Sequence, residues 1–201
     1  QMGGWFNVEI NSLADIQGLR MRISGLGCEV FRRAGGVPVA LPGAELFTSL
    51  STGAIDATEW NGPFNDMAFG LHEAARFYYY PGWHEPSGNL ECLIGSEAWA
   101  SLSPFLQNVI ETACLAETQY VTTEFAARNL QALVTLREEH GIVPRRFPDS
   151  VLSELRRNAN LVMRDLAAAD STVGKVYESY SQYADAVGGW LDISNGYFRG
   201  A

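Results

Sequence analysis

The stretch "IDATEWNGPFND", residues 55–66, places three carboxylates around a tryptophan and an Asn-Gly-Pro turn. The carboxylates belong to Asp56, Glu59 and Asp66. They can form an acidic surface loop, or one or more of them can face inward and bind a ligand. The secondary structure on either side of the stretch decides between these two arrangements.

Further candidate binding residues occur where predicted strands end. Three short apolar strands are predicted at residues 20–24, 54–60 and 77–81. In open α/β sheets, ligands bind beyond the carboxyl ends of the strands. The side chains placed there are Arg22 near the end of the first strand, Glu59 and Trp60 at the end of the second, and Trp83, His84 and Glu85 after the third. We therefore expect one guanidinium, two carboxylates and two indoles around a single crevice.

The charges of these residues restrict the ligand. Arg22 is either a surface arginine or a member of a structural ion pair, or it is a bidentate clamp for a carboxylate, which the planar guanidinium suits. Glu59 and Glu85 would repel an anionic ligand unless a bound cation bridges the ligand and the protein. Oxygen ligands favour a hard ion such as Ca²⁺ over zinc or copper. The alternative is that both glutamates form a solvated acidic rim.

The composition excludes one class of partner. The chain has 201 residues, is 47% hydrophobic and carries a formal net charge of −9 without any basic run. We therefore expect no nucleic-acid partner. Apolar runs are far shorter than the ~20 residues of a membrane span.

The cysteines Cys28, Cys92 and Cys114 are scattered, which predicts buried thiols rather than a disulfide framework or a metal site.

The first half of the chain alternates predicted strands with short helices. Besides the three strands named above, strands are predicted at residues 37–41 and 90–95, and helices at 28–36, 43–53 and 64–76. This alternation is typical of an α/β fold with an open, mostly parallel sheet.

The second half is predicted to be helical. Ser103 is a typical N-cap with Pro104 at the first helical position, and apolar residues then recur at steps of three and four as far as Gly141. This predicts one helix of roughly 35 residues, well above the average of ~11. A connector at 143–148, helices at 149–169 and 171–187, and a C-terminal tail at 188–201 follow. No H-E-x-x-H or G-x-S-x-G motif is present, so nothing favours an enzyme.

Several stretches, in their order and spacing, resemble one known family. They are "QMGGWF", "GLRMRISGLGCEVFRRAGGVPVALPGAELFTSLSTGAIDATEWNGPFND", "FGLHEAARFYYYPGWHEP" and "SEAWASLSPFLQNVIETA". Together they resemble the periplasmic solute-binding proteins of TRAP (tripartite ATP-independent periplasmic) transporters, of the DctP type. The similarity is greatest to the branch that binds 2-oxo acids and related small monocarboxylates.

This resemblance implies an α/β fold of the two-lobed, type II periplasmic-binding-protein kind. We expect residues 1–102 to form the second α/β lobe with the ligand and cation site, and residues 103–141 to form a spine helix that links the lobes. Residues 142–201 would be C-terminal helices that pack on the first lobe or on a dimer partner. Family members are longer, so we expect most of the first lobe, and a signal peptide for export to the periplasm, to lie upstream of this chain.

The resemblance also implies which residues bind the substrate. Arg22 falls where the family's arginine binds the substrate carboxylate. Trp60 and Trp83 fall at the walls of the pocket. Gln1 falls where the substrate and a cation are both contacted.

The same resemblance implies a cation site. Gln1, Glu59, the backbone carbonyl of Trp60, and Glu85 fall where this branch holds Na⁺ or Ca²⁺ against the substrate. Glu59 would therefore face inward. The two aspartates of the stretch 55–66 would be structural or exposed.

The implied function is binding rather than catalysis. A protein of this kind captures a small 2-oxo or 2-hydroxy monocarboxylate together with the cation and delivers it to TRAP membrane permease subunits. Its C-terminal helices could pair two copies into a homodimer. The rival hypotheses are a receptor for a larger acid such as a sugar acid or a dicarboxylate, a ligand-sensing module, and a metal-dependent enzyme.

Overall fold

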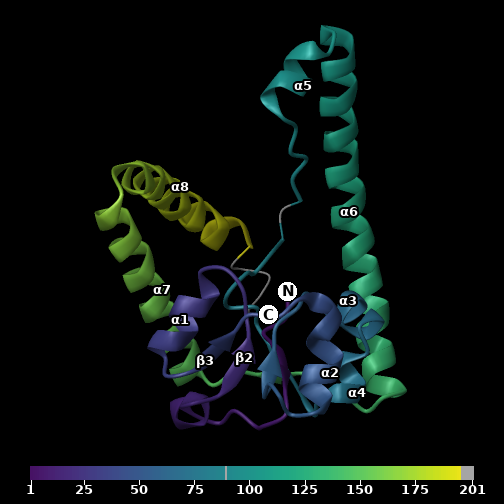
Figure 1. Cartoon of the computed structure of the whole chain (residues 1–201), viewed down its shortest axis with the longest axis vertical. Coiled ribbons are helices and arrows are strands. Elements are labelled where there is room, and N and C mark those ends of the chain that lie inside the picture. Colours follow the sequence, from purple (N-terminus) through teal and green to yellow (C-terminus); the bar gives the residue numbers. More distant parts are fainter. Residues whose placement is uncertain (89, 196–201) are drawn as a thin grey trace.

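The computed structural model describes residues 1–88 and 90–195 (Figure 1). In this part of the chain, six strands form one sheet in the order β3-β2-β4-β1-β5-β6. The strands are β1 (Gly4–Phe6), β2 (Arg20–Arg22), β3 (Val37–Val39), β4 (Ala57–Thr58), β5 (Phe77–Tyr80) and β6 (Arg145–Arg146). Because all of them are short, the sheet depends on the helices packed against it.

The sheet is mixed. β2 pairs in parallel with β3 and β4, whereas β1 pairs antiparallel with both β4 and β5. The sequence does not predict β1, because its three residues are too few to show a periodic pattern. Since β1 reverses the strand direction on both sides, β5 runs the same way as β4. The strands β2, β4 and β5 therefore end at the same edge of the sheet.

Helices cover both faces of the sheet (Figure 1). On one face lie α1 (Gly27–Arg33) and α7 (Asp149–Ala169), and on the other lie α2 (Leu46–Ser51), α4 (Leu71–Ala74) and the last turns of α6 (Pro104–Glu138). The remaining helical elements are η1 (Leu13–Ile16), η2 (Gly43–Glu45), α3 (Pro63–Ala68), α5 (Ser96–Ser101) and α8 (Ser171–Asn195).

A hydrophobic cluster on each face of the sheet forms the core. Because successive strand residues point to opposite faces, Trp5 and Phe6 in β1 belong to different clusters, as do Tyr78 and Tyr79 in β5. Trp5 stacks on Tyr78 with 4.0 Å between ring centroids. Leu136, near the end of α6, is fully buried in the same cluster. This contact anchors the long helix to the sheet.

The long helix α6 confirms the sequence prediction. It follows the N-cap Ser103, whose Oγ accepts a hydrogen bond from the Leu106 N–H at 3.4 Å, and it spans 35 residues. Its first half projects away from the sheet together with α5 (Figure 1). Apolar side chains are exposed there, including Phe105 at 75% and Leu115 at 74%. Within residues 1–88 and 90–195, no helix has the length and apolar character to cross a bilayer.

Two predictions in the first half are wrong. Residues 64–76 form two short helices, α3 and α4, because Gly70 adopts φ 68° between them and interrupts the helical backbone. Residues 90–95 form no strand. An apolar run becomes a strand only when another strand pairs with it, and none does so in the described part of the chain. Cys92 in this segment is exposed rather than buried.

The C-terminal helices largely match the sequence prediction. α7 has the predicted bounds, and α8 continues beyond residue 187 to Asn195. The connector 143–148 contains the two-residue strand β6, which pairs in parallel with β5. Residues 196–201 of the predicted C-terminal tail lie outside the described residues.

Candidate functional site

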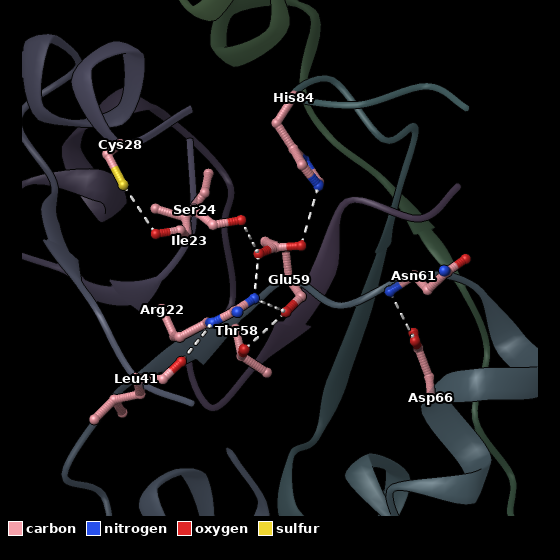
Figure 2. A network of polar contacts seen from close by, with 10 residues as sticks. All are labelled: Arg22, Ile23, Ser24, Cys28, Leu41, Thr58, Glu59, Asn61, Asp66 and His84. Carbon is pink, nitrogen blue, oxygen red and sulfur yellow. Dashed lines mark hydrogen bonds and ion pairs between the residues drawn. The ribbon is translucent and has the colours of Figure 1, made fainter. Parts of the chain in front are cut away.

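Arg22 and Glu59 meet at the edge where the parallel strands β2 and β4 end (Figure 2). Arg22 is paired in register with Thr58, and the Glu59 N–H donates to the Arg22 carbonyl at 3.1 Å. The Arg22 guanidinium donates from Nη1 to the Glu59 carboxylate and from Nε to the Leu41 carbonyl, the latter at 3.2 Å. The prediction that adjacent strand ends bring this arginine and this glutamate together is confirmed.

The Glu59 carboxylate is held inside the protein. Only 4% of its side chain is exposed, and Arg22 is 14% exposed. Its Oε1 accepts from Arg22 and from the Ser24 hydroxyl at 3.4 Å, and its Oε2 lies 3.5 Å from His84 Nε2. Because a buried charge is tolerated only when it is paired, the Arg22 guanidinium is what permits Glu59 to be buried here.

His84 is a further member of this site, for which no role was predicted from the sequence. Its side chain is 6% exposed, and neither ring nitrogen has a hydrogen-bond partner in the described part of the chain. Its imidazole points toward Glu59 (Figure 2). The signal in the sequence was its position between Trp83 and Glu85, directly after β5.

The two tryptophans lie on different sides of the site. The Trp60 ring lies under the Arg22 guanidinium, with 5.6 Å from Cζ to the ring centroid, and its indole N–H is buried without a partner among the described residues. Trp83 is half-buried against the cluster on the α1–α7 face. Together with His84 it lines a cavity of ≈ 430 Å³ bordered by α1, α7 and α8.

Gln1 and Glu85 also come to this edge, in a different relation to Glu59. The Gly82 N–H donates to the Gln1 carbonyl at 3.1 Å, and the neighbouring Met2 N–H donates to the Asn61 carbonyl at 2.9 Å. When the Gln1 side-chain amide is oriented so that both its nitrogen and its oxygen form hydrogen bonds, the nitrogen donates to the Glu85 carbonyl at 3.1 Å. The Glu85 carboxylate is exposed, unlike that of Glu59.

Asp66 organises the turn that follows Trp60. It is fully buried, and its carboxylate accepts hydrogen bonds from the Tyr78 hydroxyl at 2.7 Å, the Trp5 indole N–H at 3.0 Å and the Asn61 backbone N–H at 3.0 Å. Burial raises the pKa of Asp66 to about 6, although the three donors act in the opposite direction. Of the two predicted alternatives for this aspartate, structural or exposed, the structure shows the first.

Asp56 is also structural, at the opposite end of β2 from Arg22. It accepts hydrogen bonds from the Arg20 guanidinium, with Nη2 to Oδ1 at 2.7 Å. This partner lowers the pKa of Asp56. The only carboxylate of residues 55–66 that reaches the Arg22 side chain is therefore Glu59.

The oxygen atoms at this edge suit a hard cation by type. They comprise carboxylates, a side-chain amide and backbone carbonyls, which are the ligands of Ca²⁺ rather than of soft metals. Within residues 1–88 and 90–195, no group of three or more His, Cys, Asp or Glu side chains could hold a metal ion. A cation at this edge would therefore depend on Gln1 and on the Trp60 carbonyl as well as on Glu59.

Comparison with known proteins places the chain in a family. Residues 1–170 match the DctP family, described as bacterial extracellular solute-binding protein, family 7. The chain belongs to this family. It is 37% identical over 195 residues to the monocarboxylate 2-oxoacid-binding periplasmic protein of Nostoc sp., a match that covers 96% of this chain and 53% of the relative.

Two solved structures of TRAP periplasmic solute-binding proteins are similar to this chain. The protein from Colwellia psychrerythraea, with bound calcium and pyruvate, is 33% identical with a TM-score of 0.94, over 98% of this chain and 60% of that one. The protein from Pseudoalteromonas atlantica, with bound sodium and pyruvate, is 33% identical with a TM-score of 0.92, over 100% and 61%.

These matches confirm the predicted family and fold class. The chain spans about half the length of the curated relative and about three-fifths of the two solved structures. Its α/β fold is the one found in TRAP solute-binding proteins. The division into residues 1–102, 103–141 and 142–201 stays a prediction.

Proposed function

We propose that this chain forms the anion-binding part of an extracytoplasmic solute-binding protein of a TRAP transporter. Its ligand is a small 2-oxo or 2-hydroxy monocarboxylate, bound together with Na⁺ or Ca²⁺. The 2-oxoacid-binding relative, and the two similar structures with pyruvate and a cation, support this ligand class. The observation in this chain that carries the proposal is the buried pair of Arg22 and Glu59.

Arg22 binds the ligand carboxylate by exchanging its partner. In the structure its guanidinium is held by Glu59 and by the Leu41 carbonyl, above the Trp60 ring. An incoming carboxylate can accept the same N–H donors in a bidentate geometry. That exchange leaves the Glu59 carboxylate buried without its cationic partner, which is unfavourable.

A cation removes this penalty. When Na⁺ or Ca²⁺ binds Glu59 together with Gln1, the Trp60 carbonyl and Glu85, it replaces the charge of Arg22 and attracts the ligand anion. Cation and carboxylate therefore bind with positive linkage, and each raises the affinity for the other. Trp60 and Trp83 wall the site and exclude water from it.

The rest of the proposal concerns the protein in the cell. The loaded protein closes as a two-lobed clamp and delivers its ligand to membrane permease subunits from the periplasm. It performs no chemical reaction on the ligand and binds no nucleic acid. The exposed apolar side chains of α6, such as Phe105 and Leu115, are surfaces for the first lobe or for a second copy.

A thermal-shift panel tests this proposal. The protein as its gene encodes it, with any sequence upstream of Gln1, is stripped of metal. It is then tested with pyruvate, longer 2-oxo acids, lactate, a dicarboxylate and a sugar acid, each with Na⁺, with Ca²⁺ and with neither. A ligand at ~100 times its dissociation constant adds about 2.7 kcal/mol to the free energy of unfolding.

The pattern of stabilisation distinguishes the hypotheses. Stabilisation by a monocarboxylate only when a cation is present supports the bridged site and identifies the ion. Stabilisation by a larger acid without a cation would mean that Glu59 and Glu85 do not bind a cation with the ligand and that the proposed ligand class is wrong. Conversion of a bound acid into a product would contradict the non-catalytic function.

A further inference from the structure

Two of the three cysteines lie together away from the ligand site. Cys92 belongs to the extended segment that leads from the site to α5, and Cys114 lies in the third turn of α6. Both side chains line the same two cavities, of ≈ 400 and ≈ 570 Å³, between this segment and the helix. The segment rises beside α6 toward α5 (Figure 1). Because both cysteine side chains line the same cavities, they lie close to each other between the segment and the helix.

The environments of the three thiols differ. Cys92 is exposed, and Cys114 is half-buried. Burial raises the pKa of the Cys114 thiol, and the neighbouring Cys92 side chain raises it further. Cys28, in contrast, is occupied elsewhere, because its thiol donates to the Ile23 carbonyl at 2.9 Å.

We propose that Cys92 and Cys114 form a reversible disulfide that closes the α5–α6 hairpin. The inference takes from the proposed function only an extracytoplasmic location, where disulfide donors are available. Within the hairpin, the Gln107 side chain already donates to the Trp99 carbonyl at 2.8 Å. The disulfide adds a covalent link to this hydrogen bond.

The reaction is two successive thiol–disulfide exchanges with a disulfide donor. The exposed Cys92 thiolate attacks one sulfur of the donor, the donor's S–S bond breaks, and the first donor thiol leaves. The Cys114 thiolate then attacks the Cys92 sulfur of the mixed disulfide and releases the second donor thiol. The protein loses two protons and two electrons, and the donor disulfide is reduced to two thiols.

This disulfide would fix the segment that carries part of the ligand site. Residues 83–85 lie shortly before Cys92 on the same stretch of chain, whereas α6 is anchored to the sheet through Leu136. A covalent link between the segment and the helix restricts the motion of the hairpin in the folded protein. It also reduces the conformational entropy of the unfolded chain, which raises thermal stability.

Alkylation mapping of the full-length protein tests the proposal. The acidic side chains of Glu91, Glu111 and Glu117 line the same cavities, so the neutral donor 2-hydroxyethyl disulfide is used. After oxidation, alkylation in denaturant should label one of the three cysteines, Cys28, and a non-reduced digest should contain a peptide that joins the other two. The oxidised protein should melt roughly 5–10 °C above the reduced protein.

Single serine variants complete the test. Cys114→Ser and the exposed Cys92→Ser should each melt at the same temperature with and without the donor, whereas the matched control Cys28→Ser should keep the difference. Three alkylated cysteines after oxidation, or a mixed disulfide that persists at Cys92, would overturn the proposal. A joined peptide without any rise in melting temperature would overturn the role of the bond in closing the hairpin.

Discussion

The Arg22 guanidinium donates to the Glu59 carboxylate at the adjoining ends of two parallel strands, with only 4% of the Glu59 side chain exposed. Neither charge can be removed without leaving the other buried and unpaired, which costs about 3–5 kcal/mol in measured cases. Variants at either position are therefore expected to unfold more easily. Their ligand affinities must be measured where the protein remains folded.

Arg22→Ala is expected to abolish monocarboxylate binding. The substitution removes the bidentate donor to the ligand, and a charge-assisted pair of this kind is worth about 2–5 kcal/mol, or at least ~30-fold in affinity. Isothermal titration with pyruvate and saturating cation measures the loss. Arg22→Lys should retain part of the affinity, because an ammonium keeps the charge without the planar fork.

Arg20→Ala is the matched control for this prediction. Arg20 lies on the same strand, is 45% exposed and pairs with Asp56 rather than with Glu59. Removal of the Arg20 side chain should leave pyruvate affinity within about twofold of the wild-type value, because an exposed ion pair contributes little to the stability of the fold. Equal affinities in wild type and Arg22→Ala would refute the proposed clamp.

Glu59→Gln is expected to weaken the cation more than the carboxylate. The amide keeps an oxygen for the cation and for the Ser24 hydroxyl but removes the negative charge, so cation affinity should fall at least ~10-fold. Titration of Na⁺ and Ca²⁺ into metal-free protein measures this directly. Asp56→Asn removes a carboxylate that faces Arg20 and should leave cation affinity unchanged. A wild-type cation affinity in Glu59→Gln would exclude this carboxylate as a ligand.

The central pair of the site could be predicted from the sequence because it follows from a rule of sheet geometry. Parallel strands end at one edge of the sheet, so Arg22 and Glu59 were expected at the same edge once β2 and β4 were recognised, and the direct pairing of these two strands brings the residues into contact. The sequence places His84 at the same edge, but it does not predict that the imidazole ring points toward Glu59. The direction of the His84 ring depends on how the residue packs against α1. The His84 Cβ lies so close to Gly27 of α1 that a Cβ added to this glycine would be 3.4 Å away from it.

The errors in the predicted sheet have a common physical cause. Strands are stabilised by pairing with other strands, and the sequence of one strand does not identify its partner. The three residues of β1 gain their place by pairing on both sides, which no local pattern indicates. Residues 90–95 have the apolar pattern of a strand but no paired strand in the described part of the chain.

Gly4→Ala is expected to destabilise the protein by at least ~2 kcal/mol. Gly4 adopts φ 121°, and a Cβ added there would lie 2.5 Å from the Thr58 carbonyl oxygen in the paired strand. Urea unfolding measures the change. Gly188→Ala in α8, where a Cβ meets nothing within 4 Å, should instead stabilise by about 0.5–1 kcal/mol. Similar unfolding midpoints for Gly4→Ala and wild type would show that β1 is not held against Thr58.

Asp66 makes stability depend on pH in a direction opposite to most carboxylates. Its pKa is about 6 in the folded protein, raised by burial from 3.8. Between these two values the folded state binds more protons than the unfolded state, so stability falls as pH rises. The stabilisation is complete below pH 3.8 and lost above about pH 6. The size of the effect is about 3 kcal/mol.

Asp66→Asn is therefore expected to remove this pH dependence, because the amide does not titrate but can still accept a hydrogen bond from Tyr78 or Trp5. The wild-type free energy of unfolding minus that of Asp66→Asn should fall by about 3 kcal/mol between pH 3.5 and 7, measured by urea unfolding at each pH. The corresponding difference for Asp56→Asn should stay level between pH 5 and 7, since Arg20 lowers the pKa of Asp56 and its contribution is lost only in acid. A constant difference for Asp66→Asn would mean that its carboxylate is not buried as the structure shows.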